Sequence, residues 1–318
     1  MKKIRTVGIA ALILLWAALA LNLWFGSKAD YTYSERRSLA QMPKLSASSV
    51  FSGKFAADFE DFTLDQFPLR DSVRKVKSMF HYYVLNQSDN NGIYLVEDTV
   101  AKLEYPLDTT SVSYATGRLQ YLHDTWLKDT DCKLYFTMIP DKGYYLAEAN
   151  GYPAMDYATL EKACGQALDF AEYIDIKSLL TASDYYRTDT HWRQEQLLPV
   201  AQSLCRAMGA PIPEEEDYTR VKLDAPFYGV YFGQAALPME PEEMYLLESK
   251  LLDGCAVTDP VTGKQTAVYD MDKLTSPDLY DVFLSGAQPV LEIHNPQGDP
   301  DRELVIFSTG WAPERNTS

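Results

Sequence analysis

The feature that most constrains this chain is the apolar stretch at its N-terminus. Residues Val7 to Phe25 carry one clearly polar side chain, Asn22. A helix of roughly 20 apolar residues is long enough to cross a bilayer. Lys2, Lys3 and Arg5 precede the stretch, so the positive-inside rule keeps the N-terminus in the cytoplasm and exports the remainder. The chain is therefore expected to fold outside the cytoplasm.

Two interpretations of this stretch compete. Ala18-Leu19-Ala20 resembles the small-x-small site at which a signal peptide is cleaved. The apolar run is longer than a usual signal peptide core and continues past that site, which favours an uncleaved signal anchor. We therefore predict an anchor over residues 1–27, a juxtamembrane linker over 28–50 and an extracellular domain over 51–318. The protein would be a single-pass protein of the cell membrane, with its bulk outside.

Composition places the exported part among ordinary globular proteins. The chain of 318 residues is 46% apolar and 23% charged, which excludes wholesale disorder and coiled-coil architectures. Its formal net charge is −16. Because an acidic surface repels phosphate backbones, general binding of nucleic acid is not expected.

The cysteines form no short-range motif. The four are Cys132, Cys164, Cys205 and Cys255, and without a CxxC pair they indicate neither a redox motif nor a zinc finger. An even count in an exported chain allows two disulfides. Their places on an apolar strand and on apolar helix faces favour mostly buried free thiols.

The region just after the predicted linker is helical by pattern. Phe51, Phe55, Phe59 and Phe62 recur at spacings of four, four and three residues, which places them on one apolar helix face. A second helical pattern covers about residues 71–85. We expect these helices to precede the main sheet.

Strand-like and helix-like segments alternate further along the chain. Short apolar runs at Lys133–Ile139 and Tyr173–Ile176 alternate with helical patterns at Tyr157–Tyr173 and Trp192–Met208. Such alternation favours an α/β fold with a parallel sheet flanked by helices. The last apolar run, Leu304–Phe307, is predicted to be a central strand of that sheet.

One of the four histidines has a neighbourhood suited to chemistry. His191 follows Asp189 by two positions, just before a helical pattern, and residues at this spacing in an extended segment point to the same side. An aspartate can then orient one imidazole nitrogen and leave the other as a general base. The pattern is short, and an ordinary surface location explains it equally well. Both residues could instead bind a metal, but no further ligand at metal-like spacing completes such a site, so we predict no metal and no cofactor.

The wider pattern resembles a known family. Tyr185 to Trp192 closely matches the signature of the DHHW family of exported bacterial proteins. It is also similar to the Asp-x-His-Trp motif of alginate O-acetyltransferase-like proteins, whose domain is SGNH-hydrolase-like. The resemblance covers roughly residues 31 to 307. Further matching blocks are Ser34–Leu39, Gly53–Phe55, Asp65–Arg70, Ile139–Lys142, Asp156–Tyr157, Tyr173–Asp175, Phe227–Gly229 and Tyr280–Gly286.

The resemblance implies an SGNH-like parallel sheet and a Ser-His-Asp triad. Asp189 would orient the imidazole and His191 would be the base. Lys142 would bind a substrate anion or the oxyanion, unless it is a solvated loop lysine. Trp192 would contact substrate, or it would pack beneath the motif. All four residues are in the sequence at the matching positions.

The nucleophile is where the sequence departs from the family. In the family, a strand like Leu304–Phe307 leads into an Asp-Ser element that holds the presumed nucleophile. Here Ser308 is near that place, but residues 308–318 do not form the motif. We therefore predict a domain that is incomplete at its C-terminus and has little or no acyl transfer, because a base cannot replace a nucleophile.

Two functions remain open at this stage. The first is an O-acyltransferase or esterase, anchored outside the cell and acting on a cell-surface glycan. The second is a non-catalytic protein of the cell envelope that keeps the fold and binds polysaccharide or partner proteins. A complete triad in a full-length relative would favour the first.

Overall fold

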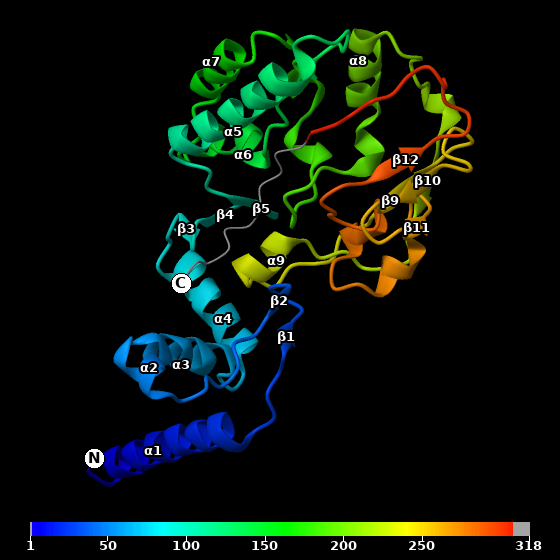
Figure 1. The fold of residues 1–318 in the computed structure, drawn as a ribbon. Coiled ribbons are helices and arrows are strands. Elements are labelled where there is room, and N and C mark those ends of the chain that lie inside the picture. The colour runs from blue at the N-terminus through cyan, green and yellow to red at the C-terminus, as the bar shows by residue number, and fades with distance from the viewer. Residues whose placement is uncertain (1, 308–318) are drawn as a thin grey trace. The chain divides into compact units, whose positions relative to one another are not determined.

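The computed structural model describes residues 2–307 and divides the chain into two compact units (Figure 1). Unit 1 comprises residues up to 100 together with residues 228–241. Unit 2 comprises residues 101–227 and the chain from residue 242 onward. The chain therefore leaves unit 2 once, contributes a segment to unit 1, and returns.

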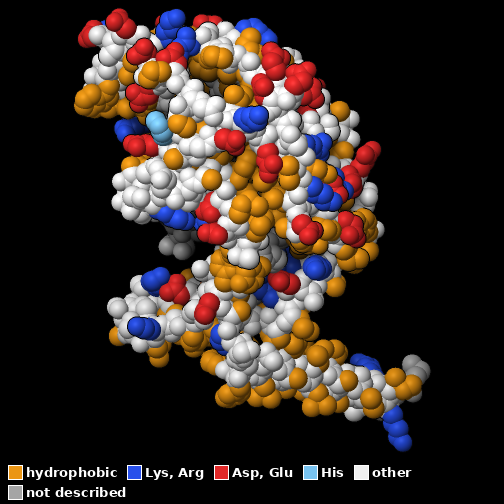
Figure 2. Space-filling view, turned by 90° about the vertical axis from the view of Figure 1, so that its right-hand side faces the viewer, with side chains coloured by type: hydrophobic (Ala, Val, Ile, Leu, Met, Phe, Trp, Pro, Cys, Tyr) orange, Lys and Arg blue, Asp and Glu red, His pale blue; other side chains and the backbone are white. Residues whose placement is uncertain are grey.

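Unit 1 begins with helix α1, Lys2–Phe25. Figure 2 shows apolar side chains along its length, and they are exposed. From Lys3 to Phe25 the helix has the length and composition to cross a membrane. This property suits a membrane anchor or a signal sequence.

Three helices follow in unit 1: α2 (Ala47–Phe51), α3 (Lys54–Asp65) and α4 (Arg70–Met79), which runs on into a π-helical turn at Phe80–Val84. Gly53, with a left-handed φ of 78°, separates the first two. Of the predicted apolar helix face, Phe62 is buried but Phe51 is exposed. The break at Gly53 is the reason, because it places Phe51 on a different helix from the other three phenylalanines.

Residues of the predicted linker carry ordered structure. Strands β1 (Tyr31–Thr32) and β2 (Arg37–Ser38) pair antiparallel. Arg37 forms a bidentate pair with the carboxylate of Asp65 at 2.7 and 2.6 Å. The Glu35 carboxylate meets Arg70 at 2.6 Å. Ionic contacts thus bind this segment to helices α3 and α4.

The core of unit 1 joins distant parts of the sequence. Strands β3 (Asp89–Asn90), β4 (Ile93–Val96) and β5 (Thr99–Lys102) form a sheet in that order. Helix α9, Val230–Ala235, comes from the returning segment. The buried cluster consists of Tyr82, Ile93, Val100, Tyr231, Ala235 and Leu237.

Unit 2 contains the remaining helices: α5 (Thr109–Leu122, followed by a π turn at His123–Leu127), α6 (Lys142–Leu146), α7 (Tyr157–Ala167) and α8 (Leu198–Met208). Short 3₁₀ segments cover Glu148–Asn150, Lys177–Leu179, Ala182–Asp184, Gln194–Gln196, Glu215–Asp217, Met271–Thr275 and Leu279–Val282.

The strands of unit 2 form three small sheets. Strands β6 (Tyr135–Phe136) and β7 (Glu172–Tyr173) pair parallel, with Tyr135 opposite Glu172. Strands β8 (Thr219–Lys222) and β9 (Tyr245–Glu248) pair antiparallel. Strands β10 (Ala256–Thr258), β11 (Gln265–Thr266) and β12 (Glu292–His294) form an antiparallel sheet in the order β11-β10-β12.

The prediction of an α/β fold is confirmed at the level of a mixed α/β architecture. Within residues 2–307, parallel pairing is confined to β6 and β7. The prediction of a central strand at Leu304–Phe307 is wrong: these residues form no strand and their side chains are exposed. A strand needs hydrogen-bonding neighbours, and the described part of the chain provides none for this apolar run.

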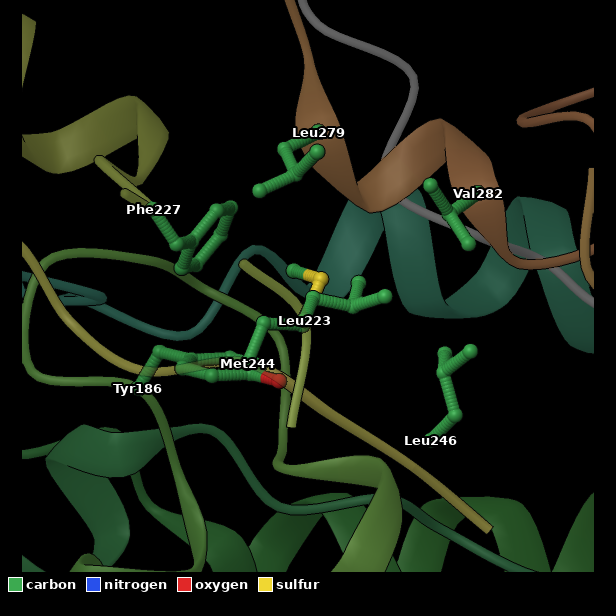
Figure 3. Close-up of a cluster of buried hydrophobic side chains, with 7 residues drawn as sticks. All are labelled: Tyr186, Leu223, Phe227, Met244, Leu246, Leu279 and Val282. Atoms are coloured by element: carbon green, nitrogen blue, oxygen red, sulfur yellow. The ribbon is translucent and has the colours of Figure 1, made fainter. Parts of the chain in front are cut away.

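Two buried clusters frame the Asp189–His191 segment in unit 2. Figure 3 shows the larger one, in which Tyr186 packs with Leu223, Phe227, Met244, Leu246, Leu279 and Val282. The second contains Ile174, Ile176, Leu180 and Val200, with Trp192 packed against it. Burial of each large apolar side chain contributes roughly 1.5–3 kcal/mol. The segment is therefore fixed at both of its ends by hydrophobic packing.

All four cysteines are free thiols. Cys255 is buried, and Cys164 and Cys205 are half-buried, in line with the sequence-based expectation. Cys132 is exposed instead. The apolar strand that was expected to cover it begins only at Tyr135.

Candidate functional site

The segment from Tyr185 to Trp192 folds back on itself. Tyr185 and Trp192 form an antiparallel bridge, and the Tyr186 N–H donates to the His191 carbonyl at 3.1 Å. The Asp189 N–H donates to the Tyr186 carbonyl at 3.4 Å. These backbone bonds make a tight turn that carries the motif, and we call residues 185–192 the motif turn.

Asp189 and His191 are in direct contact, as their spacing predicts. The distance from His191 Nδ1 to Asp189 Oδ1 is 2.6 Å. The same carboxylate oxygen accepts the His191 backbone N–H at 3.0 Å. The Asp189 side chain is fully buried, whereas the His191 side chain is 45% exposed. The pair therefore has a buried carboxylate and an accessible imidazole.

This geometry fixes the state of the imidazole. An ionised carboxylate can only accept hydrogen bonds, so Nδ1 carries a proton, and in the neutral imidazole Nε2 is the nitrogen that has the lone pair. Within residues 2–307, no side chain occupies hydrogen-bonding distance of Nε2. The His191 ring stacks on Tyr280, with centroids 4.1 Å apart and planes at 13°. The arrangement can hold an oriented general base at the surface.

The Tyr280 ring forms one side of the site and is uncharged. Its burial raises the pKa of its hydroxyl above the ordinary value, and the nearby Asp189 carboxylate raises it further. The ring therefore stays neutral at physiological pH. It holds the imidazole in plane without competing for the proton on Nδ1.

Lys142 lies beneath the motif turn. It begins helix α6 and is buried, and its ammonium donates to the carbonyls of Tyr186 at 2.8 Å and Arg187 at 3.0 Å. Burial lowers the pKa of Lys142 to about 7, although the carboxylates of Asp189 and Glu242 oppose this effect. In this position the side chain supports the backbone of the motif turn.

The structure adds a residue that sequence reasoning missed, Glu242. Its buried carboxylate accepts the backbone N–H of Arg187 at 2.6 Å and of Thr188 at 2.8 Å, and the Thr188 hydroxyl at 2.7 Å. The guanidinium of Arg193 lies 3.5 Å away. Nothing in the local sequence separates this acid from its acidic neighbours, so only the fold identifies it.

The other predicted site residues have different surroundings. Trp192 is half-buried against the cluster around Val200, which is the packing position that the sequence left open. Ser308 lies outside the described residues. Across residues 2–307, no group of three potential metal ligands converges.

With this geometry in place, comparison with solved structures identifies the class of fold. The chain is similar to a DHHW family protein from Eubacterium siraeum, with a TM-score of 0.51 and 18% identity, over 66% of this chain and 73% of that one. This likeness confirms the predicted resemblance at the level of the fold. No protein-family model and no curated protein matches the sequence.

Two further solved structures are similar to part of the chain. Bacillus cereus PatB1 with a sulfonyl adduct has a TM-score of 0.48 and 16% identity, over 64% of this chain and 74% of that one. The O-acetyltransferase domain of Pseudomonas putida AlgJ has a TM-score of 0.38 and 17% identity, over 51% of this chain and 66% of that one.

Proposed function

We propose that this is a membrane-anchored extracellular protein whose Asp189–His191 pair is the base of an acyl-transfer site. The reaction class is transfer or hydrolysis of a short acyl ester on a cell-surface glycan. One observation carries the proposal, the 2.6 Å contact between a buried carboxylate and a half-exposed imidazole. A base of this kind contributes about 10²- to 10⁴-fold to a proton-transfer step.

Each residue has a defined part in the proposed chemistry. Asp189 holds the Nδ1–H tautomer and stabilises the imidazolium that forms when Nε2 takes a proton. His191 removes that proton from the attacking hydroxyl and returns it to the leaving group. Lys142 and Glu242 are positioning residues, because they bind the backbone of the motif turn. Ser308 is the candidate nucleophile that the sequence offers, but residues 308–318 do not form the family's Asp-Ser motif, so we expect turnover by this chain to be low.

A second function, binding without catalysis, is favoured by one observation. Residues 308–318 do not form the Asp-Ser element that holds the presumed nucleophile in the family that the sequence resembles. A protein that keeps the fold without a nucleophile would bind polysaccharide or a partner protein of the cell envelope. The two functions make opposite predictions for ester turnover.

The test compares two histidines of the same unit. The full chain in detergent is assayed for hydrolysis of p-nitrophenyl acetate and for acetyl transfer to an oligosaccharide. His191→Ala should lower the rate about 10²- to 10⁴-fold. His123→Ala is the matched control, because His123 also meets an aspartate, at 2.9 Å, and should leave the rate unchanged. If wild type is no faster than His191→Ala, acyl transfer is rejected and binding is retained.

A further inference from the structure

Helix α4 and the π turn that follows it expose an apolar stripe. The exposed side chains are spaced alternately by four and three residues: Leu69, Val73, Val76, Phe80 and Tyr83. This spacing places them on one face of a helix. A helix of a soluble protein normally turns such a face toward the core.

The opposite face of α4 packs within unit 1 through polar contacts, and Tyr82 of the π turn continues that face into the apolar cluster. Arg74 donates to the Gly233 carbonyl at 2.8 Å. Ser78 is buried, and its hydroxyl accepts the Asn90 amide at 3.0 Å. Polar contacts therefore hold α4 in unit 1, and its apolar stripe is exposed. A contiguous apolar surface of this kind marks an interaction site.

The contacts between the end of α1 and the segment that precedes α4 indicate what covers the stripe. The Ala29 N–H donates to the Gln66 side-chain carbonyl at 3.1 Å, and the Gln66 amide donates to the Ala29 carbonyl at 2.9 Å. Ala29 follows the end of α1 at Phe25 by four residues, which span at most about 14 Å. The Trp24 ring also lies 6.1 Å from the Phe59 ring of α3. The start of α4 is thus held close to the end of the membrane-compatible helix.

We infer that α4 and its π turn form a second membrane contact, with the stripe at the boundary between headgroups and acyl chains. The surface is the leaflet from which α1 emerges, so the inference rests on the anchoring role of α1 proposed above. Lys75 and Lys77 flank the stripe and are exposed, and neither has an acidic partner within residues 2–307. Basic side chains beside an apolar helix face are typical of helices that lie on anionic lipid.

A polar hollow beside the stripe suits lipid headgroups. It has a volume of about 490 Å³ and is lined by Lys77, His81, Gln87, Ser88, Asp89, Asn90 and Asn91. His81 Nδ1 is buried without a hydrogen-bond partner in the described part of the chain. The ammonium, the amides and the imidazole can donate hydrogen bonds to a phosphate headgroup, whereas the Asp89 carboxylate, which accepts the Gly92 N–H at 3.0 Å, can only accept. The hollow and the stripe together provide polar and apolar contacts for the same leaflet.

The test places a polarity-sensitive fluorophore on the full chain in vesicles of phosphatidylglycerol and phosphatidylcholine. The label is attached at Val76→Cys in a Cys132→Ser background, because Cys132 is the exposed cysteine. Val261→Cys in unit 2 is the matched control, since Val76 and Val261 are 67% and 79% exposed. A nitroxide on the lipid acyl chains should quench the label at 76 about five-fold more strongly, because only that label would reach the acyl boundary.

Several results would overturn the inference. Equal quenching at both positions would mean that the stripe lies in water. Energy transfer between labels at 76 without lipid quenching would assign the stripe to a second copy. If the mature chain isolated from native membranes lacks residues up to Ala20, α1 does not anchor it and cannot hold α4 at the membrane. Lys75→Glu with Lys77→Glu should lower the quenching several-fold, and no change would reject anionic lipid as the partner. Loss of residues up to Ala20 would also overturn the anchoring role proposed for α1, whereas the quenching, energy-transfer and lysine results bear on the stripe alone and none of them depends on activity at His191.

Discussion

Unit 2 contains two aspartate–histidine pairs that are built from the same groups but exposed in opposite ways. His191 Nδ1 meets Asp189 at 2.6 Å, and His123 Nδ1 meets Asp124 at 2.9 Å. Each imidazole also stacks on an aromatic ring. In the first pair the carboxylate is fully buried and the histidine is 45% exposed. In the second the carboxylate is 57% exposed and the histidine 18%.

The difference shows that burial, not contact, distinguishes a candidate site from an ordinary surface pair. A buried carboxylate has lost its water, so its hydrogen bond to the imidazole is strong and holds one orientation. An exposed carboxylate is screened, and such pairs contribute about 0–1 kcal/mol. Only the Asp189–His191 pair combines a fixed orientation with an accessible Nε2.

The largest expected effect is on the orientation of the base. Asp189→Asn should lower ester turnover about 10³- to 10⁴-fold, because the amide can donate to Nδ1 and favour the wrong tautomer. Asp124→Asn should change the rate by less than about two-fold, since exposed pairs contribute little. Turnover and the imidazole nitrogen NMR signals are the measurements. If both variants keep the wild-type tautomer and rate, burial of the carboxylate has no role in orienting the base.

A second prediction concerns the support of the motif turn. Glu242→Ala should destabilise the protein by about 3–5 kcal/mol, because it leaves the Thr188 N–H and hydroxyl buried without their acceptor and removes one of the two buried carboxylates at Arg193, the other being Glu195. Glu243→Ala is the control: that carboxylate is exposed and pairs with Lys222 at 2.6 Å. Its loss should cost about 0–1 kcal/mol. Chemical denaturation measures the free energy of unfolding of both variants. A similar decrease in the two would show that Glu242 does not support the motif turn.

A third prediction follows from the pKa of Lys142, which burial lowers to about 7. The unfolded chain then binds a proton at this residue between about pH 7 and its ordinary pKa of 10.5, while the folded chain does not. Stability of the wild type should therefore rise with pH in this window relative to Lys142→Met, by at most about 1.4 kcal/mol per pH unit. Melting temperatures at pH 7, 8 and 9 measure it. The control is Lys162→Met, at an exposed lysine of α7, whose melting temperature should change with pH as that of the wild type does. If the melting temperature of Lys142→Met also changes with pH as that of the wild type does, the prediction is wrong.

The smallest expected effect concerns the rings beneath the two imidazoles. Tyr280 lies 4.1 Å from His191, and Phe170 lies 4.0 Å from His123. Replacing either with leucine should cost a similar stacking energy, about 0.5–1.5 kcal/mol. Only Tyr280→Leu should also lower turnover, by a few-fold. Equal turnover in both variants would show that the stack does not hold the base.

The sequence predicted the part of the site that is local. Asp189 and His191 are two residues apart, so backbone geometry alone brings them to one side. Glu242 comes from far along the chain and stands among Glu240 and Glu243, which local pattern cannot tell apart. Lys142 was selected by resemblance, but its burial depends on carbonyls that only the folded motif turn supplies.

The same distinction between local patterns and distant contacts applies to the helices and strands of the fold. Helical patterns over about residues 71–85 and the run at Tyr157 were found because their period is local. Strands require partners that periodicity does not specify. The apolar run Leu304–Phe307 therefore predicts a central strand, although the structure has no strand there.

The segment that returns from unit 2 to unit 1 has a consequence for how the chain folds during export. If the chain is exported as proposed, Ile93 and Val100 are translocated long before Tyr231 and Leu237, with which they share a core. Closing so long a loop costs little free energy, about 0.6 kcal/mol for each doubling of its length. It delays folding instead, because contacts between distant residues form slowly. In the proposed topology, unit 1 would therefore keep these apolar residues uncovered until Leu237 has been translocated.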